Sequence, residues 1–321
     1  MNRDDATGDL LRSVSRTFFL SIRILPAALR EAMGVAYLLA RTSDTIADSE
    51  SAPVSVRLRR LEEFGKMLQS GSTPQGISSI QRDIQPAHAG ERVLIAELPR
   101  VLTRFGAFRP WEWKETVELL TNIIQGQSND LRAFPDPETV AALPDAYTLE
   151  DYTYLVAGCV GEWWTRMSFH HFSRYSTRAE QELMPLAASF GKALQLVNIL
   201  RDMPADLRAG RCYLPADELQ SAGADPATLL DDPDSAQPVF DAWMEKARGF
   251  LDEGREYIRS IRPWRVRFAC YVPWRLAKKT LNLMATRPPL GSAEKVKVSR
   301  TMVYGTILRG LIAAFSNLPL R

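Results

Sequence analysis

The chain has 321 residues, which is enough for one large domain or two small ones with a sizeable core. Hydrophobic residues make up 45% of it and charged residues 24%, as in ordinary soluble globular proteins. Its three scattered cysteines argue against a disulfide framework or a cysteine metal site. No uninterrupted apolar run approaches the ~18 residues that a membrane-spanning helix needs.

The net charge of +2 is unevenly distributed. Residues 246–321 carry 16 Lys or Arg against 4 acidic residues, whereas residues 1–245 carry 24 against 34. The basic part suits anionic lipid, a dinucleotide or a substrate diphosphate, although a solvated surface explains such charge about as well. Basic motifs interleaved with aromatic residues are absent, so nucleic acid is not an expected partner. The N-terminus lacks a secretion signal, and we expect a cytoplasmic location.

Helical spacing of apolar residues recurs along nearly the whole chain. It predicts helices over residues 10–21, 28–46, 56–68, 91–105, 111–131, 149–172, 180–203, 239–261, 264–286 and 300–315. Turn-forming residues at 70–76, 85–90 and 225–238 separate several of these helices. Neither strand-like alternation nor a convincing linker appears. The sequence therefore predicts a single all-α domain over residues 1–321.

Two acidic motifs of the same form occur far apart in the chain. Each combines an arginine with two aspartates: Arg41, Asp44 and Asp48 in the first, and Arg201, Asp202 and Asp206 in the second. Residues four apart share a helix face, so each motif presents two carboxylates side by side. One such pair is more often a solvated surface feature, but the duplication in apolar surroundings favours a site. Mg²⁺ is usually held by one or two carboxylates together with substrate phosphates.

Polar residues extend the second motif toward the N-terminus. Gln195 and Asn198 fall at helical spacing with Asp202 inside an apolar run, and buried polar groups need partners. Pro204 lies between Asp202 and Asp206, where it removes a helix hydrogen bond and clashes with the carbonyl four residues earlier. We therefore expect the helix to bend or stop there, so that Asp206 reaches its metal from a kinked turn.

Five ordered blocks of sequence carry a resemblance to a known family. They are SRTFF (15–19), YLLARTSDTIAD (37–48), YTYLVAGCVG (152–161), QLVNILRDMPAD (195–206) and GRCYLP (210–215). In this order they resemble the head-to-head prenyl synthases, the squalene and phytoene synthase family, over nearly the whole chain. The resemblance implies the isoprenoid synthase fold, a helical bundle around a central cavity.

The resemblance also implies a reaction and a set of site residues. Two molecules of farnesyl diphosphate condense in the presence of Mg²⁺ (or Mn²⁺) to presqualene diphosphate, which NADPH reduces to squalene in part of the family. Catalysis is expected of Tyr37, Arg41, Tyr152 and Arg201, and metal binding of Asp44, Asp48, Asp202 and Asp206. Substrate binding is expected of Ser15, Arg16, Phe18, Val156, Gly161, Gln195, Asn198, Arg211 and Tyr213. The NADPH phosphates are expected at Lys295, Lys297 and Arg300.

One residue of the first acidic motif bears on the product. Thr45 stands where phytoene-type members more often have a second acidic residue, which favours a squalene synthase. The alternative is a phytoene, dehydrosqualene or presqualene diphosphate synthase without the reductive step. Two other classes are a non-catalytic member of the family and a cyclising or chain-elongating prenyl synthase. The intact acidic motifs argue against the former, and the blocks at 15–19 and 152–161 argue against the latter.

Two further features carry expectations of their own. Gly158 and Gly161 lie in a predicted helix, where each glycine costs about 1 kcal/mol relative to alanine. A close helix contact or room for an isoprenoid chain would explain them. The segment 301–320 combines apolar residues with arginines, and we expect either peripheral membrane contact or ordinary packing on the core, without a membrane span.

Overall fold

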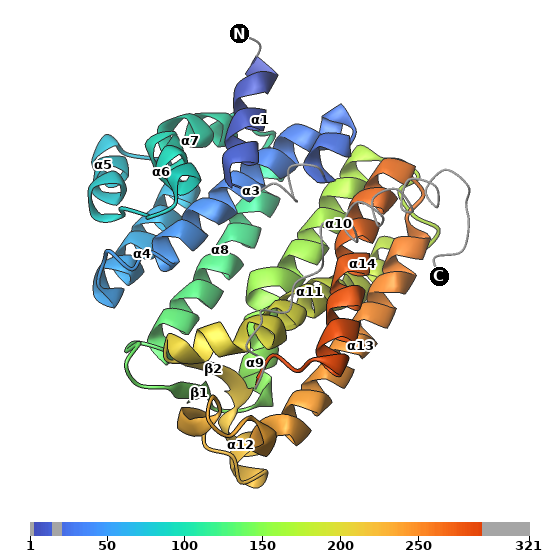
Figure 1. The fold of residues 1–321 in the computed structure, drawn as a ribbon. Coiled ribbons are helices and arrows are strands. Elements are labelled where there is room, and N and C mark those ends of the chain that lie inside the picture. Colours follow the sequence, from blue (N-terminus) through green and yellow to red (C-terminus); the bar gives the residue numbers. More distant parts are fainter. Residues whose placement is uncertain (1–2, 15–20, 291–321) are drawn as a thin grey trace. The chain divides into compact units, whose positions relative to one another are not determined.

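The computed structural model describes residues 3–14 and 21–290, which are almost entirely helical (Figure 1). The first helices are α1 (Arg3–Val14), α3 (Ala27–Ala47), α4 (Val54–Ser70), α5 (Pro74–Asp83), α6 (Ala89–Ala96), α7 (Leu98–Gly106) and α8 (Pro110–Ala133). They are followed by β1 (Ala141–Leu143), α9 (Ala146–Thr153), the π-helical turn η1 (Tyr154–Gly158), α10 (Cys159–His171), α11 (Glu180–Arg208) and β2 (Arg211–Pro215). The last are α12 (Ala216–Ser221), the 3₁₀ turns η2 (Pro226–Thr228) and η3 (Pro233–Ala236), α13 (Gln237–Ser260) and α14 (Trp264–Thr286). The all-α prediction is confirmed.

The structure departs from the sequence prediction at several elements. The helix predicted over 91–105 is two helices, α6 and α7, which meet at Glu97 just before Pro99. Part of the predicted turn at 70–76 begins helix α5, which Thr73 caps by accepting a hydrogen bond from the Gly76 N–H at 3.1 Å. The expectation of no sheet is wrong for β1 and β2, which pair in parallel with Ala141 opposite Arg211. Strands of three and five residues are too short to show a clear alternation.

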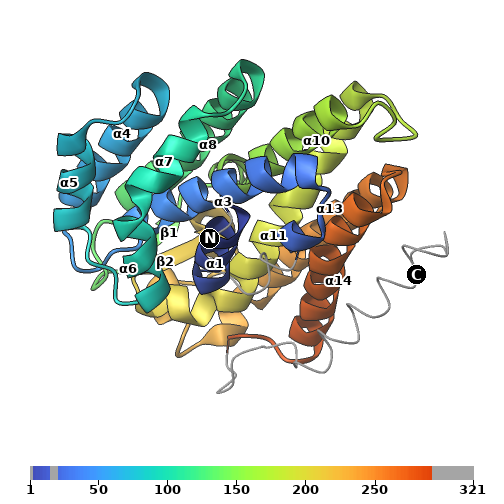
Figure 2. The same cartoon turned by 90° about the horizontal axis from the view of Figure 1, so that it is seen from above.

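The contacts of the chain divide it into two compact units, which are described separately below. Unit 1 comprises Met1–Leu131 and Arg166–Ser173, and unit 2 comprises Arg132–Thr165 and Arg174–Arg321. The single domain over 1–321 stays a prediction. In unit 1, α3 packs against α1, α4, α6 and α7 (Figure 2). Fully buried apolar side chains such as Leu29, Leu39 and Phe64 form its core.

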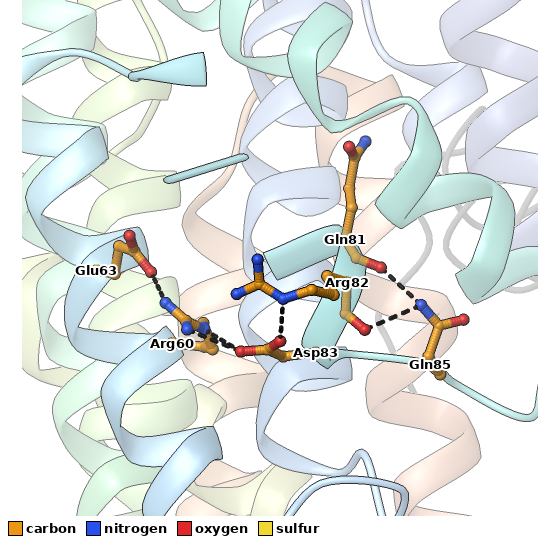
Figure 3. A network of polar contacts seen from close by, with 6 residues as sticks. All are labelled: Arg60, Glu63, Gln81, Arg82, Asp83 and Gln85. Atoms are coloured by element: carbon orange, nitrogen blue, oxygen red, sulfur yellow. Dashed lines mark hydrogen bonds and ion pairs between the residues drawn. The ribbon is translucent and has the colours of Figure 1, made fainter. Parts of the chain in front are cut away.

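A network of ion pairs joins α4 to the end of α5 within unit 1 (Figure 3). Arg60 donates from Nε and from a terminal nitrogen to one oxygen of Asp83, at 2.9 and 2.7 Å, and also pairs with Glu63. Arg82 donates to the other oxygen of Asp83 at 2.8 Å. These hydrogen bonds from Arg82 and Arg60 hold the pKa of Asp83 below its usual value. Because the Arg60 side chain is only 10% exposed, its positive charge needs these carboxylates to compensate for the loss of water.

Helix α11 is the centre of unit 2. It packs against η1, α13 and α14, and α13 and α14 run side by side (Figure 1). By length and composition α11 is long and apolar enough to cross a membrane, but half of that stretch is buried inside the protein, as in a core helix. The buried hydroxyls of Thr165, Tyr175 and Tyr257 bond to one another at 2.8 and 2.9 Å, which joins α10 to α13.

Glycines set the close approach between α11 and the segment formed by η1 and α10. A Cβ on Gly161 would lie 2.0 Å from the carbonyl oxygen of Ala187, and one on Gly191 would lie 2.1 Å from that of Ala157. A Cβ on Gly158 would meet the Tyr154 ring of its own segment at 2.8 Å and the carbonyl oxygen of Ala188 on α11 at 3.3 Å. The distances at Gly161 and Gly191 lie far inside van der Waals contact, so the backbones approach as closely as they do only because no side chain intervenes. Of the two explanations expected for Gly158 and Gly161, the structure supports the close helix contact.

We predict that Gly161→Ala lowers the stability of the protein by about 2–4 kcal/mol, because the added methyl group forces α10 away from α11. Gly249→Ala is the matched control, since a Cβ at this exposed position of α13 meets nothing within 4 Å. It should leave stability unchanged or raise it by up to about 1 kcal/mol. Urea unfolding followed by circular dichroism measures both variants. Equal midpoints for the two would contradict the packing described here.

Candidate functional site

Helix α3 presents the first acidic motif in unit 1. Its apolar residues Val35, Leu38 and Leu39 are buried, which turns the opposite, polar side of the helix outward. Asp44 lies in the last turn, and Asp48 is the C-cap residue, whose N–H donates to the carbonyl of Asp44 at 2.9 Å. The two carboxylates are therefore one turn apart at the end of the helix, where the Asp48 side chain is exposed.

Arg41 is held by two carboxylates from different helices. One terminal nitrogen donates to Asp44 and the other donates to Glu91 in the first turn of α6. Sequence reasoning missed Glu91, because it lies 50 residues from Arg41 and belongs to none of the recognised blocks. Burial lowers the pKa of Arg41, whereas Asp44, Glu91 and, to a smaller extent, Tyr37 raise it. Together these three residues outweigh burial, so the pKa lies above its ordinary value. Arg41 is thus a permanent cation at this site.

Asp44 has a strongly perturbed acidity. Desolvation by the surrounding protein, followed by repulsion from the Asp48 carboxylate, raises its pKa to about 7, and Arg41 only partly opposes this. The side chain is 40% exposed, so water screens part of the repulsion. A carboxylate pair of this kind gains from any cation that binds between or beside its members.

The neighbouring hydroxyl groups of α3 bond to their own helix. The Thr45 hydroxyl donates to the carbonyl oxygen of Arg41 at 2.8 Å, and Thr42 donates likewise to Leu38 at 2.9 Å. Thr45 is 2% exposed. The position at which phytoene-type members more often have an acidic residue is therefore packed inside unit 1, away from the polar face that Asp44 shares with Asp48.

Helix α11 presents the second motif in unit 2. Arg201 donates two hydrogen bonds to Asp202, from Nε at 3.2 Å and from a terminal nitrogen to the other oxygen. The helix continues through Pro204 to Arg208, so of the expected bend or stop the stop is wrong, and the bend stays a prediction. Asp206 is half-buried, and its charge adds to the burial that raises the pKa of the Cys212 thiol to about 12. The Asp206 carboxylate therefore lies close enough to β2 to act on the Cys212 thiol.

The polar residues that precede the second motif are accessible rather than buried. Asn198 is exposed, and Gln195 and Asp202 are half-buried. The expectation of a buried polar stripe with protein partners is therefore wrong for Asn198. Because Leu196, Ile199 and other apolar residues of α11 face the core, the polar residues line the remaining side of the helix. They are open to a ligand.

Aromatic residues from α9, from β2 and from the residue that follows α8 gather in unit 2. The rings of Tyr152 and Tyr213 stack at 5.2 Å, and Phe134 meets Tyr213 edge-on at 5.2 Å. The prediction that Tyr152 and Tyr213 belong to one lining fits this contact, whereas Phe134 was not foreseen. Val156 lies in the π-helical turn η1, a rare geometry that often marks functional sites. The close contact with Ala187 accounts for a glycine at Gly161, and its contact with substrate stays a prediction.

Both motifs offer ligands that suit a divalent cation. Within residues 3–14 and 21–290, no three His, Cys, Asp or Glu side chains gather as a metal cage. Each motif supplies two carboxylates, which is the number that Mg²⁺ commonly takes from a protein when substrate phosphates and water complete its coordination. Desolvation and, after it, repulsion from Asp48 raise the pKa of Asp44, so a cation bound beside the pair would favour its charged form. The donor set therefore fits Mg²⁺ bound together with a diphosphate.

Several predicted residues lie outside the described part of the chain. These are Ser15, Arg16 and Phe18, and the residues expected to bind NADPH, Lys295, Lys297 and Arg300. The predicted helix 300–315 lies there as well. Of the described residues, Tyr37, Arg41, Asp44 and Asp48 share α3, whereas Gln195, Asn198, Arg201, Asp202 and Asp206 share α11. Arg211 and Tyr213 follow on β2.

The sequence is similar to those of proteins named presqualene diphosphate synthase and squalene synthase. The chain is 31% identical to the presqualene diphosphate synthase of Zymomonas mobilis over 68% of its length, and 27% identical to the squalene synthase of Yarrowia lipolytica over 94%. It spans 62% and 65% of the length of these two relatives. It is also 27% identical to the presqualene diphosphate synthase of Sinorhizobium fredii, over 92% of this chain and 93% of the relative.

Solved structures share the fold. A complex of TcSQS with a ligand has a TM-score of 0.79 at 21% identity, covering 98% of this chain and 89% of that chain. A dehydrosqualene synthase complex has a TM-score of 0.67 at 18% identity, covering 97% and 96%. The sequence model of the family described as squalene/phytoene synthase matches residues 11–302. The chain therefore belongs to the squalene/phytoene synthase family.

Proposed function

We propose that this protein condenses two molecules of farnesyl diphosphate head to head into presqualene diphosphate and then reduces this intermediate to squalene. The observation that carries the proposal is the pair of arginine-flanked acidic motifs on α3 and α11, in a chain that belongs to this family. Relatives named squalene synthase and presqualene diphosphate synthase support the class of reaction.

The aspartates and arginines of the two motifs have different roles in binding and ionising the substrates. Asp44 with Asp48, and Asp202 with Asp206, would hold Mg²⁺, which when bound stabilises the negative charge of a departing diphosphate. Arg41 and Arg201 donate from planar guanidinium groups, which match phosphate oxygens in geometry. Each arginine pairs with an aspartate of its own motif, so its charge is kept balanced until a ligand is bound.

Carbocation chemistry requires a dry, polarisable lining. The stacked rings of Tyr152 and Tyr213, with Phe134 at their edge, offer aromatic faces that stabilise a nearby cation by about 0.5–2 kcal/mol each. Tyr37 lies one helical turn before Arg41 on α3, and we assign its hydroxyl to proton removal after the first coupling. Released diphosphate would serve as the final base.

The reductive step distinguishes squalene synthase from its nearest alternative. Two of the relatives described above are named presqualene diphosphate synthase, which favours that alternative, an enzyme that stops at the intermediate. For the reductive reading, Lys295, Lys297 and Arg300 supply the positive charge that the phosphates of NADPH require. Peripheral membrane contact of segment 301–320 and a cytoplasmic location stay predictions.

We predict that Asp44→Ala and Asp202→Ala each reduce presqualene diphosphate formation by at least about 100-fold, because each removes a metal ligand whose charge stabilisation is worth several kcal/mol. Asp252→Asn, at an exposed position of α13, is the matched control and should retain activity. Conversion of labelled farnesyl diphosphate at saturating Mg²⁺ measures all three. Activity within threefold of the parent in either alanine variant would exclude that motif from the site.

The acidity of Asp44 predicts a pH-dependent stability. Its pKa is raised in the folded protein, so the folded state binds a proton that the unfolded state releases, and stability falls as pH rises from about 4 to about 7. Metal-free Asp44→Asn should therefore melt higher than the parent at pH 8 by about 2–4 °C, after allowance for screening at this partly exposed side chain. The difference should vanish near pH 4. A constant difference across this range would show that Asp44 titrates normally.

The product test decides the reductive step. With farnesyl diphosphate and Mg²⁺ alone, we expect presqualene diphosphate to accumulate, and with NADPH we expect squalene. Lys295→Ala with Lys297→Ala should suppress squalene while presqualene diphosphate still forms, because only the cofactor phosphates lose their partners. Gas chromatography with mass spectrometry identifies the products after phosphatase treatment. Identical products with and without NADPH would establish the non-reducing alternative.

A further inference from the structure

Glu91 holds the same guanidinium group that pairs with the first acidic motif. Arg41 uses one terminal nitrogen for Asp44 and the other for Glu91, and its Nε is buried without a hydrogen bond to any described residue. The Glu91 side chain is 19% exposed, whereas that of Asp44 is 40% exposed. Glu91, the less exposed of the two carboxylates, lies on a different helix from the motif, so its pairing with Arg41 is less screened by water.

The position of Glu91 is fixed by close packing within unit 1. It lies in the first turn of α6, where the His88 side chain caps the helix by accepting a hydrogen bond from the Gly90 N–H at 3.2 Å. A Cβ on Gly90 would lie 2.3 Å from the carbonyl oxygen of Ser13, so α6 approaches the backbone of α1 directly. Helix α6 also packs against α3. The backbone that carries Glu91 therefore has little freedom to move away from Arg41.

We propose that Glu91 is a positioning residue, which keeps Arg41 in place when Asp44 exchanges its arginine partner for a metal ion. In the metal-free protein Arg41 balances both carboxylates. When Asp44 turns to a cation, Glu91 retains one end of the guanidinium group, and the other end is released to donate to a diphosphate oxygen. This role rests on the proposed function and adds a residue to its metal-diphosphate site.

The alternative arrangement shows why a second carboxylate matters. Without Glu91, Asp44 would be the one acidic partner of Arg41 among the described residues. The arginine would then compete with the metal ion for the same carboxylate, and its long side chain would lose its anchor once Asp44 was taken. Loss of Glu91 should therefore weaken metal and diphosphate binding without touching a metal ligand, as removal of residues that orient ligands commonly does.

Binding of inorganic pyrophosphate in the presence of MgCl₂, measured by isothermal titration calorimetry on the full chain, tests this role. Glu91→Gln should weaken Mg²⁺-dependent pyrophosphate binding by about tenfold, within the range seen for residues that orient metal ligands. Glu91→Asp keeps the charge on a shorter side chain and should weaken binding severalfold, but less than Glu91→Gln does. Glu97→Gln, at the other end of α6 with a side chain 41% exposed, is the matched control and should bind as the parent does.

The outcomes separate this inference from the proposed function. If the parent protein fails to bind pyrophosphate with Mg²⁺, the proposed function itself is wrong. If the parent binds and Glu91→Gln binds equally well, only the role of Glu91 is overturned. A purely structural role would lower the melting temperature without changing the Mg²⁺ concentration for half-maximal binding. Should Glu91→Gln fail to fold, Glu91→Asp decides the matter, because the shorter side chain should raise that concentration severalfold, and an unchanged value would overturn the role.

Discussion

Repulsion between carboxylates one helical turn apart is the constraint around which the site is built. Neighbouring negative charges on a helix face destabilise it, and partial burial makes their repulsion larger. At the first motif, desolvation raises the pKa of Asp44, and repulsion from Asp48 adds to this shift. An arginine in each motif partly compensates for the negative charge: Arg41 at the first motif and Arg201 at the second. A motif that is only partly neutralised in this way retains an affinity for additional positive charge.

Close backbone contacts at glycines hold the helices that carry these motifs in each unit. In unit 1, close contact at Gly90 fixes α6 against α1, so that a carboxylate from α6 reaches across to α3. In unit 2, Gly161 and Gly191 allow α11 to lie directly on the η1 and α10 segment. Glycine weakens each helix locally, and the contact that it permits offsets this cost. The π-helical turn that bears Val156 shares this close contact, and it directly follows α9, which carries Tyr152.

The two arginines are not equivalent, although their motifs look alike. Arg201 donates two hydrogen bonds to the adjacent Asp202, in a local fork that needs no second helix. Arg41 instead divides its terminal nitrogens between two helices. A local pair follows its own helix, whereas a pair shared between helices keeps its position when one partner is lost. The first motif is therefore the one whose arginine is held by a neighbouring helix.

Local sequence was sufficient for the helices, the acidic motifs and the family, because apolar spacing and short ordered blocks depend on neighbouring residues. Thus α3, α8, α13 and α14 lie close to their predicted ranges, and Arg41 and Asp44 share a face as expected. Tertiary structure alone decided what lies far apart in the chain. The pairing of Arg41 with Glu91, the parallel strands β1 and β2, and the path of α11 through Pro204 depend on packing, which no local pattern records.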